Sequence, residues 1–203
     1  MRVLKFTPTE RFGSNMFVLI SNGDAAVIDP SVEYSKIKTQ ISGEFLRFKY
    51  IILTHAHFDH MLELDGWVEA TGADVIVGKD DAPALSDSYF NCYKLFSGRN
   101  LGYYGGYKTV EDGDLLLLGE KTLRVMLTPG HSSGAITLST DSALFVGDTL
   151  FFGGSYGRTD LPGGDEVKLF SSIKYILSED ENKTVYSGHG PDTTLREIKS
   201  NFI

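Results

Sequence analysis

The five histidines of this sequence are concentrated at a few points that could bind metal ions. Three of them occur within the segment THAHFDH at residues 54–60, and the other two each follow a glycine far downstream. Imidazole nitrogens and carboxylate oxygens are suitable ligands for zinc, iron or manganese. Together with nearby aspartates they form a set of candidate ligands: His55, His57, Asp59, His60, His131, Asp148 and His189. These residue types predict a centre for divalent metal ions.

Each of these points comes after a short apolar run with the composition of a β-strand. The runs that precede them are KYIIL (49–53), TLRVML (122–127), ALFV (143–146) and TVY (184–186). Strand ends at one edge of a fold deliver their side chains to a shared rim. A turn leaving a strand can point His55 and His57 at one ion, while Asp59 and His60 face a neighbouring position. A carboxylate has two oxygens, so an aspartate can bridge the two ions.

The elements that must position these residues can be read from the apolar pattern. Strands are expected at residues 16–20, 25–28, 49–53, 74–77, 114–118, 122–127, 135–138, 143–146 and 184–186. Near-helical spacing predicts helices over 33–46, 60–70 and 165–177. This order favours a layered α/β fold in which two sheets pack face to face. With 203 residues, we expect residues 1–203 to form a single domain.

Residues 86–109 interrupt this pattern with glycines and aromatic side chains that show no clear period. The segment is either a surface connection with a small core of its own or a loop that covers the substrate. It contains Cys92, the only cysteine, so the chain can form no internal disulfide. We interpret Cys92 as a small buried apolar residue rather than a nucleophile.

Charge and composition exclude several classes of partner. The net charge of −8 argues against nucleic acid, which is bound mainly through clustered Lys and Arg. No apolar run reaches the roughly 18 to 20 residues that span a bilayer. The first residues, MRVLKFTPTE, also lack the apolar stretch of a signal peptide. We therefore expect a cytoplasmic protein with a small-molecule substrate and no membrane partner.

The spacing of these motifs resembles that of the metallo-β-lactamase superfamily, whose signature THxHxDH stands here at residues 54–60. Further segments match in the same order: Asp29 after AAVI, TPGHSSG (128–134), GDTLF (147–151) and SGHGPDTT (187–194). The resemblance implies a four-layer αββα sandwich, with two mixed sheets flanked by helices and the metals at one edge. It also implies that the first metal is bound by His55, His57 and His131, the second by Asp59, His60 and His189, with Asp148 as the bridge.

The implied cofactors are two divalent metal ions, with zinc expected first and iron or manganese as alternatives. Metal binding lowers the pKa of water to about 7 and so supplies a bridging hydroxide as nucleophile. Asp59 is then a possible proton acceptor as well as a ligand. The two ions exceed the charge of Asp59, Asp148 and one hydroxide by about one unit, which favours an anionic transition state and an anionic substrate.

Within the superfamily, GDTLFFGGSYGRTDLPGGD (147–165) looks most like the short, one-domain relatives of glyoxalase II, the hydroxyacylglutathione hydrolases. Those enzymes are thioesterases of S-acyl glutathione substrates such as S-lactoylglutathione. Asp148 disfavours β-lactamase activity, because the commoner β-lactamases depart from aspartate at the bridging position. Two alternatives stay open: an iron-dependent persulfide dioxygenase, which also carries a GRTD segment, and a non-catalytic metal-binding protein.

Two further residues have two interpretations each. Arg158 could bind an acyl oxygen or a carboxylate of the substrate, or it could form an ion pair with Asp160 that shapes the loop. Asp29 could orient a metal-binding histidine by a hydrogen bond, or it could simply begin the Asp-Pro turn.

Overall fold

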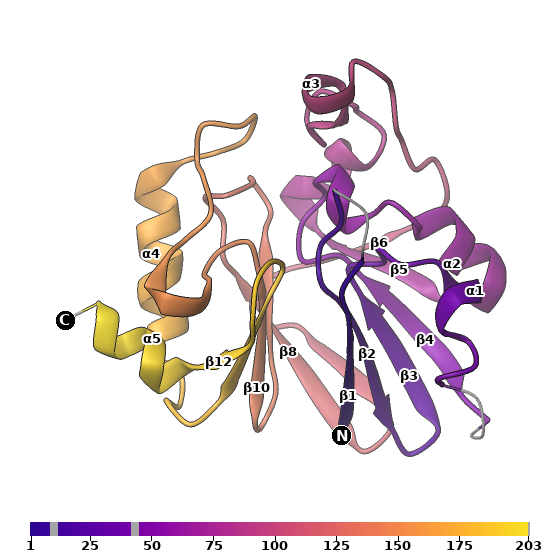
Figure 1. Cartoon of the computed structure of the whole chain (residues 1–203), viewed down its shortest axis with the longest axis horizontal. Coiled ribbons are helices and arrows are strands. Elements are labelled where there is room, and N and C mark those ends of the chain that lie inside the picture. The colour runs from indigo at the N-terminus through magenta and orange to yellow at the C-terminus, as the bar shows by residue number, and fades with distance from the viewer. Residues whose placement is uncertain (9–11, 42–44, 203) are drawn as a thin grey trace.

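Two six-stranded sheets pack face to face and carry helices on their outer faces (Figure 1). The computed structural model describes residues 1–8, 12–41 and 45–202. The first sheet contains, in spatial order, β1 (Arg2–Phe6), β2 (Met16–Ser21), β3 (Asp24–Ile28), β4 (Arg47–Ile52), β5 (Asp74–Gly78) and β6 (Lys108–Val110). Strands β1 to β3 are antiparallel neighbours, whereas β3 to β6 run parallel.

The second sheet is also mixed. Its spatial order is β12 (Thr193–Thr194), β11 (Thr184–Ser187), β10 (Ala143–Gly147), β9 (Ile136–Ser139), β8 (Lys121–Leu127) and β7 (Leu115–Leu118). Strands β10 and β11 are parallel, and the other neighbours are antiparallel. Because β10 and β11 run in the same direction, the residues that follow them emerge at the same edge of the sheet.

Strands buried on both faces explain why the sequence shows continuous apolar runs. In β2, Met16 and Val18 pack towards the outer helices, while Phe17 and Leu19 pack between the sheets. Successive side chains of a strand point to opposite faces, so a strand covered on both sides must be apolar throughout. A core between the sheets and a core beneath the helices on each side give four layers.

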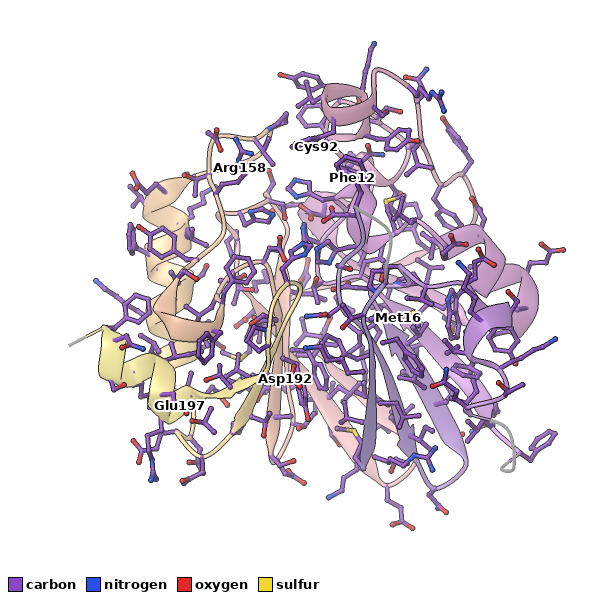
Figure 2. The ribbon with its side chains drawn as sticks, viewed as in Figure 1. Phe12, Met16, Cys92, Arg158, Asp192 and Glu197 are labelled. Carbon is purple, nitrogen blue, oxygen red and sulfur yellow. The ribbon has the colours of Figure 1, made fainter. Side chains whose placement is uncertain are left out.

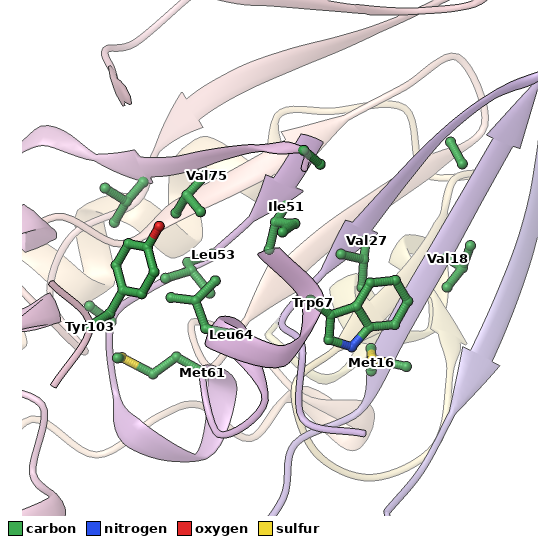
Figure 3. Packing of buried hydrophobic residues seen from close by; sticks show 14 of the residues in the cluster. Met16, Val18, Val27, Ile51, Leu53, Met61, Leu64, Trp67, Val75 and Tyr103 are labelled. Carbon is green, nitrogen blue, oxygen red and sulfur yellow. The ribbon is translucent and has the colours of Figure 1, made fainter. Parts of the chain in front are cut away.

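The outer layers are formed by α1 (Tyr34–Ile37) and α2 (Leu64–Thr71) on one side and by α4 (Glu166–Leu177) and α5 (Leu195–Asn201) on the other. Trp67 of α2 is fully buried against Met16 and Val27, and its indole Nε1 donates to Val32 O (Figure 3). Among the described residues, none of the helices has the length and apolar character needed to cross a bilayer. The expected α/β sandwich is confirmed.

Some boundaries differ from the sequence-based expectation. Every expected strand is present, but β1, β6 and β12 were not predicted. Two of these are only two or three residues long, and β1 is a half-buried edge strand that carries Arg2 and Lys5, so local composition indicates them poorly. The helix expected over 60–70 begins only at Leu64, because His60 belongs to a short 3-10 helix, η1 (Phe58–His60).

The helix expected over 33–46 was wrong in extent, since only Tyr34–Ile37 is helical; residues 42–44 lie outside the described residues. Its apolar residues Ile37 and Ile41 are nevertheless buried against the first sheet, so the spacing indicated burial rather than a long helix.

Residues 86–109 contain a short helix, α3 (Tyr93–Ser97), at the top of the molecule in Figure 1. A 3-10 helix, η2 (Lys79–Leu85), leads into the segment. The Phe58 ring contacts Tyr93 and Phe96 with ring centroids 5.4 and 5.8 Å apart, so α3 packs beside the THAHFDH turn. Cys92 is buried, as expected.

Candidate metal centre

The THAHFDH turn brings its histidines inward directly after β4. Thr54 fixes the start of the turn, because its backbone N and its Oγ1 both donate to the carboxylate of Asp29 at 2.7 Å. Asp29 itself follows β3, the parallel neighbour of β4. His55, His57 and His60 are all buried, with at most 4% of their surface exposed.

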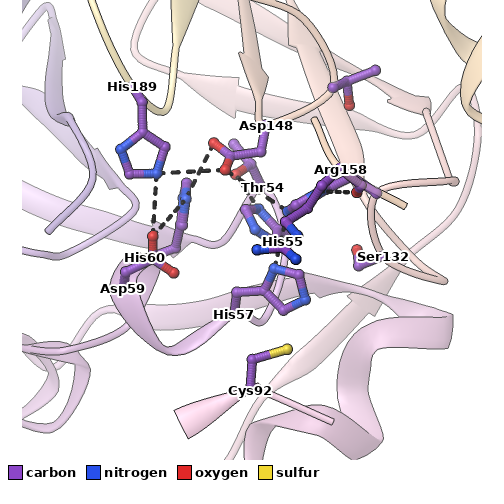
Figure 4. A network of polar contacts seen from close by, with 12 residues as sticks. Thr54, His55, His57, Asp59, His60, Cys92, Ser132, Asp148, Arg158 and His189 are labelled. Carbon is purple, nitrogen blue, oxygen red and sulfur yellow. Dashed lines mark hydrogen bonds and ion pairs between the residues drawn. The ribbon is translucent and has the colours of Figure 1, made fainter. Parts of the chain in front are cut away.

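The second sheet supplies the other candidate ligands from across the edge. Asp148 directly follows β10, His189 lies two residues beyond β11, and His131 lies in the turn after β8. Asp148 and His189 lie beside the THAHFDH turn in Figure 4, and the ligand atoms of His131 lie within 4.8 Å of those of His55 and His57. Gly188 is required for this approach, since a Cβ there would overlap the Asp148 carboxylate and the His60 ring.

The ligand atoms form three overlapping groups within which all atoms lie within 4.8 Å of one another. The groups are His55, His57 and His131; His55, His60 and Asp148; and Asp59, His60 and His189. Asp148 lies between the first and the third group, because its Oδ2 is 3.7 Å from His131 Nε2 and its Oδ1 is 3.4 Å from His60 Nε2. The first and third groups have the same members as the two ligand sets that the motif resemblance implies.

Several of these buried atoms have no hydrogen-bond partner among the described residues: His55 Nε2, His57 Nε2, His60 Nε2 and Asp148 Oδ1. Leaving buried polar atoms unsatisfied is unfavourable, so their concentration at one point needs an explanation. Divalent cations bind imidazole nitrogen and carboxylate oxygen. The donor set therefore fits a metal centre.

Residues around the candidate ligands fix which ring nitrogen faces the centre. His60 Nδ1 donates to Asp29 Oδ2 at 2.8 Å, and His131 Nδ1 donates to the carbonyl oxygen of Arg158 at 2.8 Å. In each ring this leaves Nε2 to point inward. Asp29 thus contacts both the start of the turn and one of its histidines, as the orienting interpretation requires.

Comparison with known proteins identifies the family. Residues 9–189 match the Metallo-beta-lactamase superfamily. The chain belongs to this superfamily. The probable metallo-hydrolase YqgX of Bacillus subtilis (strain 168) is 35% identical over 191 residues, which make up 93% of this chain and 90% of that protein. The hydroxyacylglutathione hydrolase GloC of Haemophilus influenzae is 28% identical over 201 residues, covering 97% of this chain and 94% of GloC.

Solved structures of the superfamily are similar over nearly the whole chain. The structure of the BLEG-1 B3 metallo-beta-lactamase has a TM-score of 0.89 and 32% identity, and covers 98% of this chain and 97% of its own. The structure of TTHA1623 in a di-iron-bound form has a TM-score of 0.84 and 30% identity, and covers 100% of both chains. The fold that places the ligands is therefore that of a metallo-beta-lactamase superfamily member.

Burial keeps two of the candidate ligands of this superfamily member neutral. It lowers the pKa of His55 well below the ordinary value, and burial together with the neighbouring His131 lowers the pKa of His57 to about 3. Neutral imidazole is the form of histidine that binds metal ions. His55 and His57 are thus neutral, and able to bind a metal ion, at physiological pH.

The other side of the centre favours protonation. Burial alone would lower the pKa of His60, but the carboxylates of Asp29, Asp59 and Asp148 raise it well above the ordinary value. Burial also opposes the charge on His189, yet hydrogen bonds to Asp148 and Asp59 raise its pKa to about 9. The acidic side chains therefore attract positive charge to this position, and protons and metal ions compete for it.

Asp81 is a residue of the site that the sequence interpretation missed. Its buried carboxylate accepts hydrogen bonds from Ala56 N at 3.0 Å, from Ser132 Oγ at 2.7 Å and from the backbone N of Gly134. Ala56 stands between two candidate ligands, and Ser132 follows another. Asp81 thus joins the turns that carry His55, His57 and His131. The signal that could have indicated it is an acid shortly after β5, as Asp29 follows β3.

The centre opens into a cavity of about 260 Å³. Arg158 lines it, and this arginine is paired with Asp160 through two contacts of 2.6 Å, Nε to Oδ1 and Nη2 to Oδ2. The hydrogen bonds from Arg158 lower the pKa of Asp160 to about 2. The ion pair considered from the sequence is present, and Arg158 still borders the cavity (Figure 2).

Proposed function

We propose that this superfamily member is a metal-dependent thioesterase that hydrolyses S-acyl glutathione-type substrates, as S-lactoylglutathione exemplifies. The observation that carries the proposal is the convergence of buried, unpartnered ligand atoms at the base of an open cavity. The similarity to GloC and the GDTLFFGGSYGRTDLPGGD segment support the thioester as substrate. We place the reaction in the cytoplasm.

We assign two divalent ions to the centre, zinc before iron or manganese. His55, His57 and His131 would hold the first, Asp59, His60 and His189 the second, and Asp148 would bridge them. Ions bound there would lower the pKa of water to about 7 and polarise the thioester carbonyl.

The residues of the chain then hold and move protons. Asp59 Oδ2 lies 3.1 Å from His189 Nε2, next to the cavity, where it can accept the proton of the attacking water. Asp29 and the Arg158 carbonyl keep the His60 and His131 rings oriented throughout. The Arg158 guanidinium lies where an anionic part of the substrate could replace Asp160 as its partner.

The proposal is tested with purified protein loaded separately with zinc, iron and manganese. We expect S-lactoylglutathione to be hydrolysed, with activity lost by more than about a hundredfold in His57→Ala and Asp148→Ala. Asp80→Asn, an exposed acid outside the ligand groups, is the matched control and should keep full activity. Binding of one iron with rapid oxygen uptake on glutathione persulfide, and no thioester cleavage, would identify a dioxygenase instead. Loss of metal without loss of the biological role would indicate a non-catalytic protein.

Hydrolysis of β-lactams is the second candidate function, because the chain is 32% identical to BLEG-1 over nearly its full length. The same metal-loaded preparations should therefore be given a chromogenic cephalosporin. Turnover of this compound with no turnover of thioesters would replace the first proposal by the second.

A further inference from the structure

An aromatic wall, formed by Phe12, Phe58 and Phe96, borders the cavity beside the metal centre. The Phe58 ring is central, with ring centroids 6.2 Å from Phe12 and 5.8 Å from Phe96. Phe58 stands between His57 and Asp59 in the sequence, so the turn that positions the ligands also positions this ring. A group that contacts the aromatic wall would therefore lie next to the reacting bond.

The aromatic wall is exposed where it meets the cavity. Phe58 is 6% exposed, whereas Phe12 is 50% and Phe96 is 48% exposed. Large apolar side chains gathered at the mouth of a polar centre are typical of a ligand site. Figure 2 shows Phe12 and Cys92 facing the Arg158 loop across the opening.

The rest of the cavity offers little to a highly charged group. Leu161 lines it, as does Cys92, whose thiol stays neutral because burial raises its pKa to about 11. Arg158 is the only lysine or arginine among the described residues that line the cavity, so a single anionic group of the substrate could pair there in place of Asp160. Beyond the metal ligands, the lining is thus mainly apolar.

We propose that the aromatic wall is a subsite for an alkyl or aryl group attached directly beside the thioester. This inference rests on the proposed thioesterase function and narrows its substrate to a class more apolar than a lactoyl ester. In the reaction, the acyl carbon gains the oxygen of water, the carbon–sulfur bond breaks, and the thiol sulfur takes a proton. The apolar group belongs either to the acyl part or to the thiol, and the two sources can be separated by experiment.

The zinc-loaded protein is given two substrate series. One keeps glutathione as the thiol and varies the acyl group through acetyl, lactoyl, butyryl and phenylacetyl. The other keeps acetyl and varies the thiol from glutathione to benzyl mercaptan. We expect kcat/KM to rise about tenfold or more towards the aryl member of one series, because apolar contact of this size gives such discrimination.

Substitutions in the aromatic wall test whether it causes the preference for aryl substrates. Phe96→Ala and Phe12→Ala should reduce kcat/KM for the aryl substrate about tenfold more than for the acetyl substrate. Leu95→Ala is the matched control, since Leu95 is also about half exposed on α3 but does not line the cavity. Equal rates across both series, or equal losses for every substrate in Phe96→Ala, would overturn the inference while leaving the thioesterase proposal intact.

A binding measurement tests the subsite even if no thioester is cleaved. Phenylacetate and benzyl mercaptan represent the two halves of an aryl thioester, and calorimetry measures their binding to the zinc-loaded protein. We expect either phenylacetate to bind about tenfold more tightly than lactate, or benzyl mercaptan to bind about tenfold more tightly than free glutathione. In Phe96→Ala this difference in affinity should be lost. Failure of every thioester as substrate together with this binding pattern would defeat the proposed function but not the subsite. Equal affinity for the compounds with and without the aryl group would contradict the subsite.

Discussion

At the scale of single residues, the carboxylates of the centre favour positive charge beside them, which either protons or metal ions can supply. Asp29, Asp59 and Asp148 raise the pKa of His60, and Asp148 and Asp59 raise that of His189. Protein stripped of metal should therefore carry positive charge on these two imidazoles near neutral pH. Metal ions that bind the same nitrogens must displace those protons.

We expect zinc binding to the stripped protein to release about two protons from these imidazoles near neutral pH, and fewer as the pH rises through about 9, where His189 loses its proton without metal. Calorimetry in buffers of different ionisation enthalpy measures the number of protons released. Zinc binding without proton release would contradict the assignment of His60 and His189 as ligands.

The same pKa shifts set the pH dependence of the stripped protein. A histidine whose folded pKa is raised stabilises the fold fully below its ordinary pKa of 6.5, and this contribution is lost as the pH rises. For His189 the loss should occur between about 6.5 and about 9. Urea unfolding of stripped wild-type protein and His189→Ala across this range should therefore converge at the alkaline end.

Gly188 tests how tightly the residues are packed. Gly188→Ala places a methyl group against Asp148 and His60, so we expect metal binding to weaken by about tenfold or more while the circular dichroism spectrum is unchanged. Gly106→Ala is the control, because a Cβ there meets no atom within 4 Å. Equal metal affinity in both variants would show that the site can expand around the methyl group.

At the scale of elements, turns at the ends of strands carry every candidate ligand, and acids hold these turns in place. Asp29 joins the end of β3 to the turn after β4, and Asp81 joins η2 to the turns after β4 and β8. Backbone amides satisfied by a buried carboxylate give a turn one defined geometry.

Asp81 is expected to act on metal binding through the turns it joins. In Asp81→Asn the side-chain NH₂ cannot accept the hydrogen bonds that the second carboxylate oxygen receives, so the His55–His57 turn and the His131 turn should move relative to each other. We expect affinity for the first metal to fall by about 10- to 100-fold and the cobalt(II) spectrum to change. Asp80→Asn, its exposed neighbour, should leave both unchanged. An unaltered cobalt spectrum in Asp81→Asn would restrict Asp81 to a purely structural role.

At the scale of the whole molecule, the centre connects the two sheets. His55, His57 and His60 come from the first sheet, whereas His131, Asp148 and His189 come from the second. Asn15 also joins the two sheets without a metal ion. Its Nδ2, just before β2, donates to Ser187 O at 2.9 Å and to Gly190 O at 3.0 Å in the second sheet and the turn after β11.

Metal ions should therefore stabilise the entire fold. Ligand present at a thousand times its Kd contributes about 4 kcal/mol, so chelation should lower the Tm of the loaded protein by roughly 8 to 16 °C. Asp148→Ala, which removes the ligand that we propose to bridge the two ions, should lose most of this difference. A Tm that does not respond to chelation in the wild-type protein, once metal loss has been verified, would contradict a centre shared by both sheets.

The sequence alone determined nine of the twelve strands in the described part of the chain, all except β1, β6 and β12, and it determined the set of candidate ligands. Strand periodicity is local, and imidazole and carboxylate keep their chemistry in any fold, so THAHFDH and the apolar runs before His131, Asp148 and His189 were sufficient. The prediction of a helix over 33–46 was wrong in extent, because burial against a sheet can produce near-helical spacing without a long helix.

Only the tertiary structure decided which atoms face one another. The hydrogen bonds of Asp81, the pairing of Arg158 and the aromatic wall join residues that lie far apart in the chain or depend on side-chain direction. Their distances follow from how two sheets and a short helix pack together, and no local pattern encodes that packing. For the same reason, the sequence indicated a metal centre, whereas the fold indicated what kind of molecule fits beside it.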